Sequence, residues 1–221
     1  MGLIWLVRHG QAAFGAADYD VLSPLGGRQA AALTDRLRRL GRIDRVVHGD
    51  LVRQRVTAEL ALQPLGFEVP IVQDARWNEF DQEALLVRTR PSGEAAVVAD
   101  EQGRRDKVLL ADAIDRATER WVADARGPTP GSFGAFRGGV EEGLADVATA
   151  PGTTVVFSSA GVIGAACLDL LGLPDSAWPH LNRVMVNAGV TKLVVGRRGV
   201  TLVSFNDHAH LEHDRELVTY R

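Results

Sequence analysis

The stretch Leu3-Ile4-Trp5-Leu6-Val7-Arg8-His9-Gly10 decides the fold and indicates the chemistry. Its first five residues form an uncharged run of branched and aromatic side chains, which predicts a buried β-strand. In an open α/β sheet, ligands bind beyond the carboxyl ends of the strands, so we expect Arg8, His9 and Gly10 at a binding edge. A histidine there can attack phosphorus, an arginine can hold phosphate oxygens, and a glycine lets the backbone come close to a ligand. Taken alone, these three residues are as consistent with a basic loop at the end of a strand as with a phosphate-binding site.

Composition sets ordinary limits on function. The chain has 221 residues, of which 46% are hydrophobic and 24% charged, enough to bury the core of one domain. The formal net charge is -3 and no basic stripe is present, so we expect neither a nucleic-acid nor a membrane partner. The single cysteine, Cys167, lies in an apolar run and predicts a buried thiol without a disulfide. With no signal-like segment at Met1, we expect a cytoplasmic protein.

Strand-like and helix-like segments alternate along the chain, which predicts an α/β fold with a mostly parallel sheet. We treat residues 1–221 as a single domain. Ser23-Pro24 supplies an N-cap and a first-turn proline for one helix. The other expected elements are strands at 45–48, 68–72 and 153–157, helices at 51–62, 133–147 and 161–171, and a hairpin over 191–205.

The region from Leu85 to Thr129 differs from this alternation. A polar stretch over 90–105 is followed by a predicted amphipathic helix, which the glycines and prolines of 127–131 end. Its expected buried face carries Leu110, Ile114, Ala117 and Trp121. We expect this insertion, about residues 85–130, to fold over the ligand edge of the sheet.

Further segments follow Arg8-His9-Gly10 in a set order. They are Tyr19–Gly26 with Gln29-Ala30, Asp50–Ala58, Trp77–Asp81 and Val155–Ile163. In order and spacing they resemble the histidine phosphatase superfamily, whose fold is phosphoglycerate mutase-like. In that family the second segment reads S-x-L-x-R-A-x-Q-T-A and the last reads V-V-S-H-G-G-x-I. The resemblance extends from about residue 3 to about residue 210.

The resemblance implies a three-layer α/β sandwich and phosphoryl transfer through a phosphohistidine. His9 would attack phosphorus, and Arg8 and Arg53 would hold the phosphoryl oxygens. Glu79 would protonate the leaving oxygen, which requires a raised pKa. Gln11 would contact the phosphate. The implied substrate is a phosphorylated small molecule, no cofactor or metal is needed, and the insertion helps to choose the substrate.

The last segment departs from the family pattern. Ser159 stands where the second catalytic histidine is expected, and Ala160 replaces the first glycine. Three interpretations follow: a slower phosphatase that holds phosphate with the Ser159 hydroxyl and the amides of Ala160 and Gly161, an inactive phosphoester-binding or regulatory protein, or replacement by another histidine. The candidates for that replacement are His180, His208 and His210.

We favour a phosphatase of reduced or specialised activity and rank a phosphoglycerate mutase below it. A metal site at His208, His210 and His213 ranks lower than a structural role, because only His210 and His213 share a helical spacing. The sequence specifies neither the substrate nor the oligomeric state.

Overall fold

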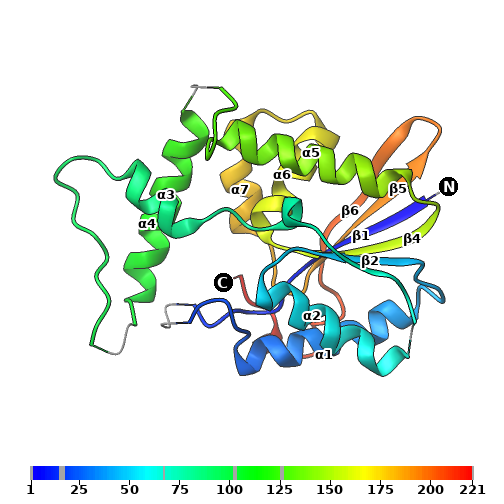
Figure 1. Ribbon diagram of the computed structural model, residues 1–221. Helices are drawn as coiled ribbons and strands as arrows, with labels where there is room; N and C mark the ends of the chain where they lie inside the picture. The colour runs from blue at the N-terminus through cyan, green and yellow to red at the C-terminus, as the bar shows by residue number, and fades with distance from the viewer. Residues whose placement is uncertain (1, 15–17, 67, 102–103, 125–126, 221) are drawn as a thin grey trace.

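The computed structural model describes residues 2–14, 18–66, 68–101, 104–124 and 127–220 (Figure 1). These residues form an α/β fold around a six-stranded sheet with the strand order β3-β2-β4-β1-β5-β6. The strands are β1 (Gly2–Arg8), β2 (Arg45–His48), β3 (Ile71–Gln73), β4 (Gly152–Ser158), β5 (Val190–Gly196) and β6 (Gly199–Asp207). The helices are α1 (Pro24–Arg38), α2 (Val52–Leu62), α3 (Gln82–Thr89), α4 (Lys107–Ala123), α5 (Phe133–Thr149), α6 (Ala160–Leu171) and α7 (Trp178–Arg183).

The sheet is mostly parallel, as predicted. Strands β1 to β4 pair in parallel, and β5 and β6 form the expected antiparallel hairpin beside β1. Arg8 lies opposite Ser158 in the register of β1 and β4. The residues that follow, His9 and Ser159, therefore leave the sheet side by side at its carboxyl edge.

Alternate residues of β1 enter two separate cores. Ile4 and Leu6 pack with residues of α5 and α6, whereas Trp5 and Val7 pack with residues of α1 and α2. Figure 1 shows α1 and α2 below the sheet and α5, α6 and α7 above it. The three-layer sandwich is thus confirmed, and its central strand carries the candidate nucleophile at its end.

Local signals fix the helix that packs behind the His9 loop. Ser23 caps α1 by accepting a hydrogen bond from the Gly26 amide at 3.1 Å, and Pro24 occupies the first turn, both as predicted. Strand β3 is shorter than the predicted 68–72. Pro70 has no N–H with which to extend the ladder, although its carbonyl accepts a hydrogen bond from the Val46 amide at 3.0 Å.

The region predicted as an insertion contains α3, an irregular segment and α4. The predicted buried face of α4 is confirmed, whereas the sequence pattern predicts neither α3 nor the short α7. Figure 1 shows α3 and α4 standing at one end of the upper helical layer. Val98 and Arg104 line a surface pocket with Ala13 and Phe14, which follow the His9 loop. Among the described helices, none is long and apolar enough to cross a membrane.

Candidate active site

The end of strand β1 and the first turn of helix α2 bring His9 and Arg53 together. His9 is only 3% exposed, and its Nδ1 lies 2.7 Å from the carbonyl oxygen of Gly10. Because a carbonyl can only accept, Nδ1 carries the proton and Nε2 keeps its lone pair. Nε2 accepts a hydrogen bond from Nε of Arg53 at 3.2 Å. The atom that could act as a nucleophile therefore faces a cation.

The charge state of His9 suits this role. Burial lowers the pKa of His9 well below its ordinary value of 6.5, and the charges of Arg53 and Arg8 lower it further. The hydrogen bond to Gly10 acts in the opposite direction and is a smaller effect. The imidazole is consequently neutral at pH 7, as nucleophilic attack requires.

Arg53 is itself held in place by the loop before α1. Its Nη1 lies 2.7 Å from Oδ1 of Asp20, and its guanidinium carbon lies 4.9 Å from the centre of the Tyr19 ring. The other oxygen of Asp20 accepts a hydrogen bond from the Val52 amide at 2.9 Å and so caps α2, whose own N-cap residue, Leu51, has no side-chain cap. Asp20 was not singled out from the sequence, although it lies within a family-like segment.

Arg8 is buried and is held from the carboxyl-terminal end of the chain. Its Nη1 donates to the carbonyl oxygen of Met185 and to that of Tyr220, the latter at 2.8 Å. These contacts fix the guanidinium beside the candidate nucleophile. Its role as a phosphate clamp stays a prediction.

Gly10 allows α1 to pack tightly against the nucleophile loop. A Cβ at Gly10 would lie 2.4 Å from the carbonyl oxygen of Gly26, and a Cβ at Gly26 would lie 2.1 Å from that of Gln11. The Gly10 amide donates to Oγ1 of Thr57 at 3.0 Å, and the Thr57 hydroxyl donates to the carbonyl oxygen of Arg53 at 2.6 Å. Thr57 therefore ties the backbone beside His9 to the turn of α2 that carries Arg53.

Glu79 has the raised pKa that a catalytic acid requires. Burial raises the pKa of its carboxyl above the ordinary value of 4.5, against the opposing effects of the Gly161 amide, Arg53, Arg8 and the Phe80 amide. Its Oε2 accepts a hydrogen bond from the Gly161 amide at 3.1 Å, and its Oε1 accepts one from the Phe80 amide at 3.3 Å. The same two arginines thus act on both His9 and Glu79.

An aromatic cluster forms the apolar side of this carboxyl group. The ring of Phe80 lies 5.1 Å from that of Trp121 and 5.7 Å from that of Trp178, measured between centroids. Trp178 donates from Nε1 to the carbonyl oxygen of Gly161 at 2.8 Å. A Cβ at Gly161 would lie 2.2 Å from Oε1 of Glu79, so only glycine leaves room for the carboxylate. Because α4 supplies Trp121, the predicted insertion contributes to the surroundings of the acid.

Ser159 is fully buried at the amino-terminal end of α6. Its Oγ accepts a hydrogen bond from Nε2 of Gln54 at 2.9 Å, and it makes no capping bond to α6. The Gly161 amide was expected to bind phosphate. In the structure it donates its hydrogen bond to Glu79 instead, because the carboxylate lies against the first turn of α6. Ala160 opens the helix, where amides have no acceptor within the helix itself.

Comparison with known protein families identifies the superfamily of this chain. The family model described as "Histidine phosphatase superfamily (branch 1)" matches residues 4–208. This chain belongs to the histidine phosphatase superfamily. A search of curated proteins gave no match.

Solved structures of similar fold cover nearly the whole chain. A phosphoserine phosphatase variant from Entamoeba histolytica, in complex with phosphoserine, has a TM-score of 0.66 at 18% identity, covering 96% of this chain and 100% of that chain. The mycobacterial glucosyl-3-phosphoglycerate phosphatase has a TM-score of 0.65 at 24% identity, covering 94% and 99%. The α-ribazole phosphatase from Shigella flexneri has a TM-score of 0.63 at 22% identity, covering 93% and 96%. At these identities the likeness shows the shared fold.

Four other candidate residues from the sequence form no side-chain hydrogen bond with His9 or Arg53 among the described residues; they are Gln11, His180, His208 and His210. The Gln11 carboxamide oxygen accepts from the Ser23 hydroxyl at 2.8 Å, so the side chain is tied to the start of α1. His180 is exposed on α7, His208 contacts the carbonyl oxygen of Asn206 at 2.7 Å, and His210 lines a pocket with Arg36 and Arg39. Across the described ranges, none of these three histidines is hydrogen-bonded to His9, Arg53 or Ser159. The same ranges contain no group of three or more His, Cys, Asp or Glu side chains placed to hold a metal.

Proposed function

We propose that this protein is a phosphatase that hydrolyses the phosphate monoester of a small molecule through a phosphohistidine at His9. The observation that carries the proposal is the fixed state of His9, with its proton on Nδ1, a low pKa and Nε2 facing Arg53. A buried imidazole that is neutral and aimed at a cation suits attack on an anionic phosphorus centre. The phosphatases of similar fold support the same reaction class.

The proposed reaction has two steps. Nε2 of His9 forms a bond to phosphorus while the ester P–O bond breaks, and Glu79 gives its proton to the leaving oxygen. The Glu79 carboxylate then takes a proton from a water molecule that attacks the phosphohistidine. This attack releases inorganic phosphate and restores both residues.

The arginines supply the positive charge in both steps. When a phosphoryl group enters, the Nε–H of Arg53 that now points to His9 can turn to a phosphoryl oxygen, and Arg8 can bind a second one. The Ser159 hydroxyl, the Ala160 amide and the Gln11 amino group would complete the cradle. Because Ser159 brings no charge, we expect a slower enzyme; a single lost donor costs about 10²- to 10³-fold in rate.

Ser159 also keeps open the second candidate function, a phosphoester-binding protein without turnover. The buried carboxyl of Glu79, with its raised pKa, supports catalysis, since a protein that only binds a phosphoester needs no proton donor for a leaving group. A mutase ranks lower, because it requires a phosphoenzyme that water does not discharge.

The substrate we propose is a small phosphorylated metabolite, the class to which the named substrates of the similar structures belong. The insertion residues that share a pocket with Ala13 and Phe14 are candidates for selecting it. The single cysteine, buried and unpaired, fits a reducing cytoplasmic compartment.

Hydrolysis of an aryl phosphate between about pH 5 and pH 8, without added metal, tests the proposal. We expect turnover by the wild type, loss of turnover in His9→Ala and retained turnover in the control His180→Ala, which changes an exposed histidine. If the wild type shows no turnover while vanadate still raises its melting temperature, the binding function replaces the phosphatase.

A further inference from the structure

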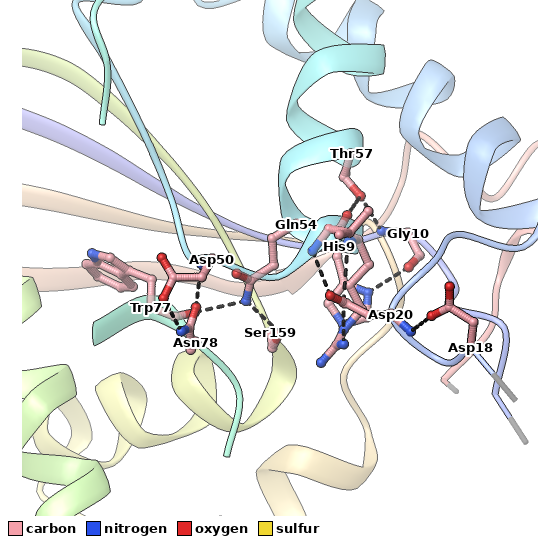
Figure 2. A network of polar contacts seen from close by, with 12 residues as sticks. His9, Gly10, Asp18, Asp20, Asp50, Gln54, Thr57, Trp77, Asn78 and Ser159 are labelled. Atoms are coloured by element: carbon pink, nitrogen blue, oxygen red, sulfur yellow. Dashed lines mark hydrogen bonds and ion pairs between the residues drawn. The ribbon is translucent and has the colours of Figure 1, made fainter. Parts of the chain in front are cut away.

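Gln54 is a fully buried polar residue that the proposed reaction leaves without a role. It follows Arg53 on α2, and its Nε2 donates to the carbonyl oxygen of Trp77 and to Oγ of Ser159, both at 2.9 Å (Figure 2). Because the carbonyl of Trp77 can only accept, the amino group of Gln54 must be on this side of the carboxamide. The direction of the hydrogen bond to Ser159 is therefore fixed: Gln54 donates and Ser159 accepts.

This direction determines where the hydroxyl proton of Ser159 can go. With Oγ accepting from Gln54, the proton must point elsewhere, and the described residues offer it no acceptor. Buried hydroxyl groups normally have an acceptor for their proton. Ser159 leaves the sheet beside His9, so a phosphoryl oxygen bound there can be that acceptor.

Both positions of this contact differ from the pattern of motifs that the family resemblance implies. That pattern has alanine where this chain has Gln54 and histidine where it has Ser159. Compared with that pattern, this chain carries the smaller side chain at the N-cap of α6 and the larger one on α2. The two new side chains are hydrogen-bonded to each other.

Gly49 provides the room for the Gln54 carboxamide. A Cβ at Gly49 would lie 2.2 Å from Oε1 of Gln54 and 2.3 Å from Oδ1 of Asn78. A larger residue at position 49 would therefore push the carboxamide away from Ser159. The absence of a side chain at Gly49 thus leaves space for the Gln54 carboxamide that binds Ser159.

We infer that Gln54 is a positioning residue that holds the Ser159 hydroxyl as a neutral hydrogen-bond donor to the phosphoryl group. The inference rests on the proposed phosphatase function. It assigns the work of the missing imidazole to a pair of side chains, Gln54 and Ser159, instead of to Ser159 alone.

The isosteric variant Gln54→Glu tests the direction of this hydrogen bond. An ionised carboxylate cannot donate to Ser159 or to Trp77, whereas a protonated carboxyl can donate to one of them. We expect kcat to fall about 10- to 100-fold near neutral pH and to recover partly as the pH is lowered, with a smaller change in KM. The matched control is Gln63→Glu, an exposed position just beyond α2, which should keep the wild-type pH profile.

A double-mutant cycle tests whether the two residues act as a unit. We expect Gln54→Ala and Ser159→Ala each to slow turnover, and the double variant to be no slower than the worse single variant. We also expect Ser159→His to be improved by adding Gln54→Ala, because the carboxamide occupies the space that an imidazole needs. Circular dichroism and vanadate binding establish that each variant is folded.

The outcomes separate the two proposals. A pH profile of Gln54→Glu parallel to the wild type, or additive effects in the cycle, would overturn the role of Gln54 while leaving the phosphatase intact. A wild type without turnover overturns the phosphatase itself, and the inference with it.

Discussion

Two histidines of this protein lie at the carboxyl ends of two parallel strands of the same sheet, β1 and β2, which β4 separates. His9 follows β1 and His48 ends β2; both are buried, at 3% and 6% exposure. Each is followed by glycine, and each Nδ1 contacts the carbonyl oxygen of that glycine, at 2.7 Å for His9 and 2.6 Å for His48. Their local geometry therefore fixes the same tautomer in both rings.

Their surroundings differ. Nε2 of His9 faces Arg53, whereas His48 lines a surface pocket on the other side of α2 with Arg55 and Ala58. In the part of the chain that the structure describes, no arginine or lysine donates to the His48 ring. The comparison teaches that the turn at the end of a strand fixes the histidine tautomer and leaves Nε2 with a lone pair. Whether that nitrogen faces a cation depends on a residue of a different element, Arg53 of α2 in the case of His9.

The largest expected difference between the two histidines is the site of the covalent intermediate. After rapid mixing with substrate and an alkaline quench, which preserves phosphohistidine, mass spectrometry should find phosphate on the peptide that contains His9. We expect none on the peptide that contains His48. We expect His9→Ala to abolish both the label and turnover, a loss on the order of 10⁴- to 10⁶-fold, and His48→Ala to keep both. Label on His48 would contradict the comparison.

The next difference is the state of the carboxyl group: the pKa of Glu79 is raised, chiefly by burial, whereas hydrogen bonds from Gln73 and Asn78 and the charge of His48 lower the pKa of Asp50. Glu79→Gln should lower kcat for an alkyl phosphate by about 10²- to 10⁴-fold and should affect an aryl phosphate less, because an aryl oxide leaves without a proton. The raised pKa of Glu79 keeps it protonated above the usual range, so wild-type kcat should fall as the pH rises through that pKa. The variant should lose this alkaline limb.

The matched control for the acid is Glu83→Gln, an exposed carboxylate on α3 that contacts Arg105. It should leave the pH profile unchanged. Equal losses on alkyl and aryl substrates in Glu79→Gln would exclude proton donation to the leaving group.

Removal of the Arg53 guanidinium takes away the side-chain contact that distinguishes the ring of His9 from that of His48. We expect Arg53→Met to lower kcat by about 10²- to 10³-fold. It also removes a charge that lowers the pKa of His9, so the acid limb of the pH profile should move to higher pH. Arg55→Met, one residue beyond Gln54 and half-exposed, is the control. An unmoved acid limb in Arg53→Met would show that Arg53 does not set the charge state of the nucleophile.

The smallest expected effect concerns stability. Because the pKa of His9 is lowered in the folded protein, the unfolded chain binds the additional proton as the pH falls below 6.5, and the free energy of unfolding decreases there. His9→Gln removes this proton uptake, so its melting temperature should fall less than that of the wild type between about pH 7 and pH 5, by a few degrees. His48→Gln is the control. Parallel curves for wild type and His9→Gln would refute the lowered pKa.

Much of the fold could be predicted because its signals are local. The apolar run of β1, the Ser23-Pro24 start of α1 and the spacing of Leu110, Ile114 and Trp121 on α4 each lie within a few residues. The short helices α3 and α7 have too few turns for such a pattern to appear.

The candidate site could be predicted only in part. Its histidine and arginines lie at the end of β1 or in the first turn of α2, and its acid lies in the loop before α3. A short sequence motif marks each of these places. Asp20 and Gln54 gain their roles from partners far along the chain, since Arg53 lies 33 residues from Asp20 and Ser159 lies 105 residues from Gln54. Without the folded structure, a buried glutamine on a helix is indistinguishable from one that only fills space.

The hydrogen bonds that hold Arg8 have a consequence for the order in which the site can assemble during translation. Its guanidinium is bound by carbonyl groups of Met185 and Tyr220, the latter 212 residues away in sequence. During synthesis the amino-terminal part of a chain emerges first. His9, the proposed nucleophile, is therefore translated long before the two carbonyl groups that hold Arg8 beside it. A nascent chain that has not yet reached Met185 and Tyr220 carries His9 without the groups that fix the neighbouring guanidinium.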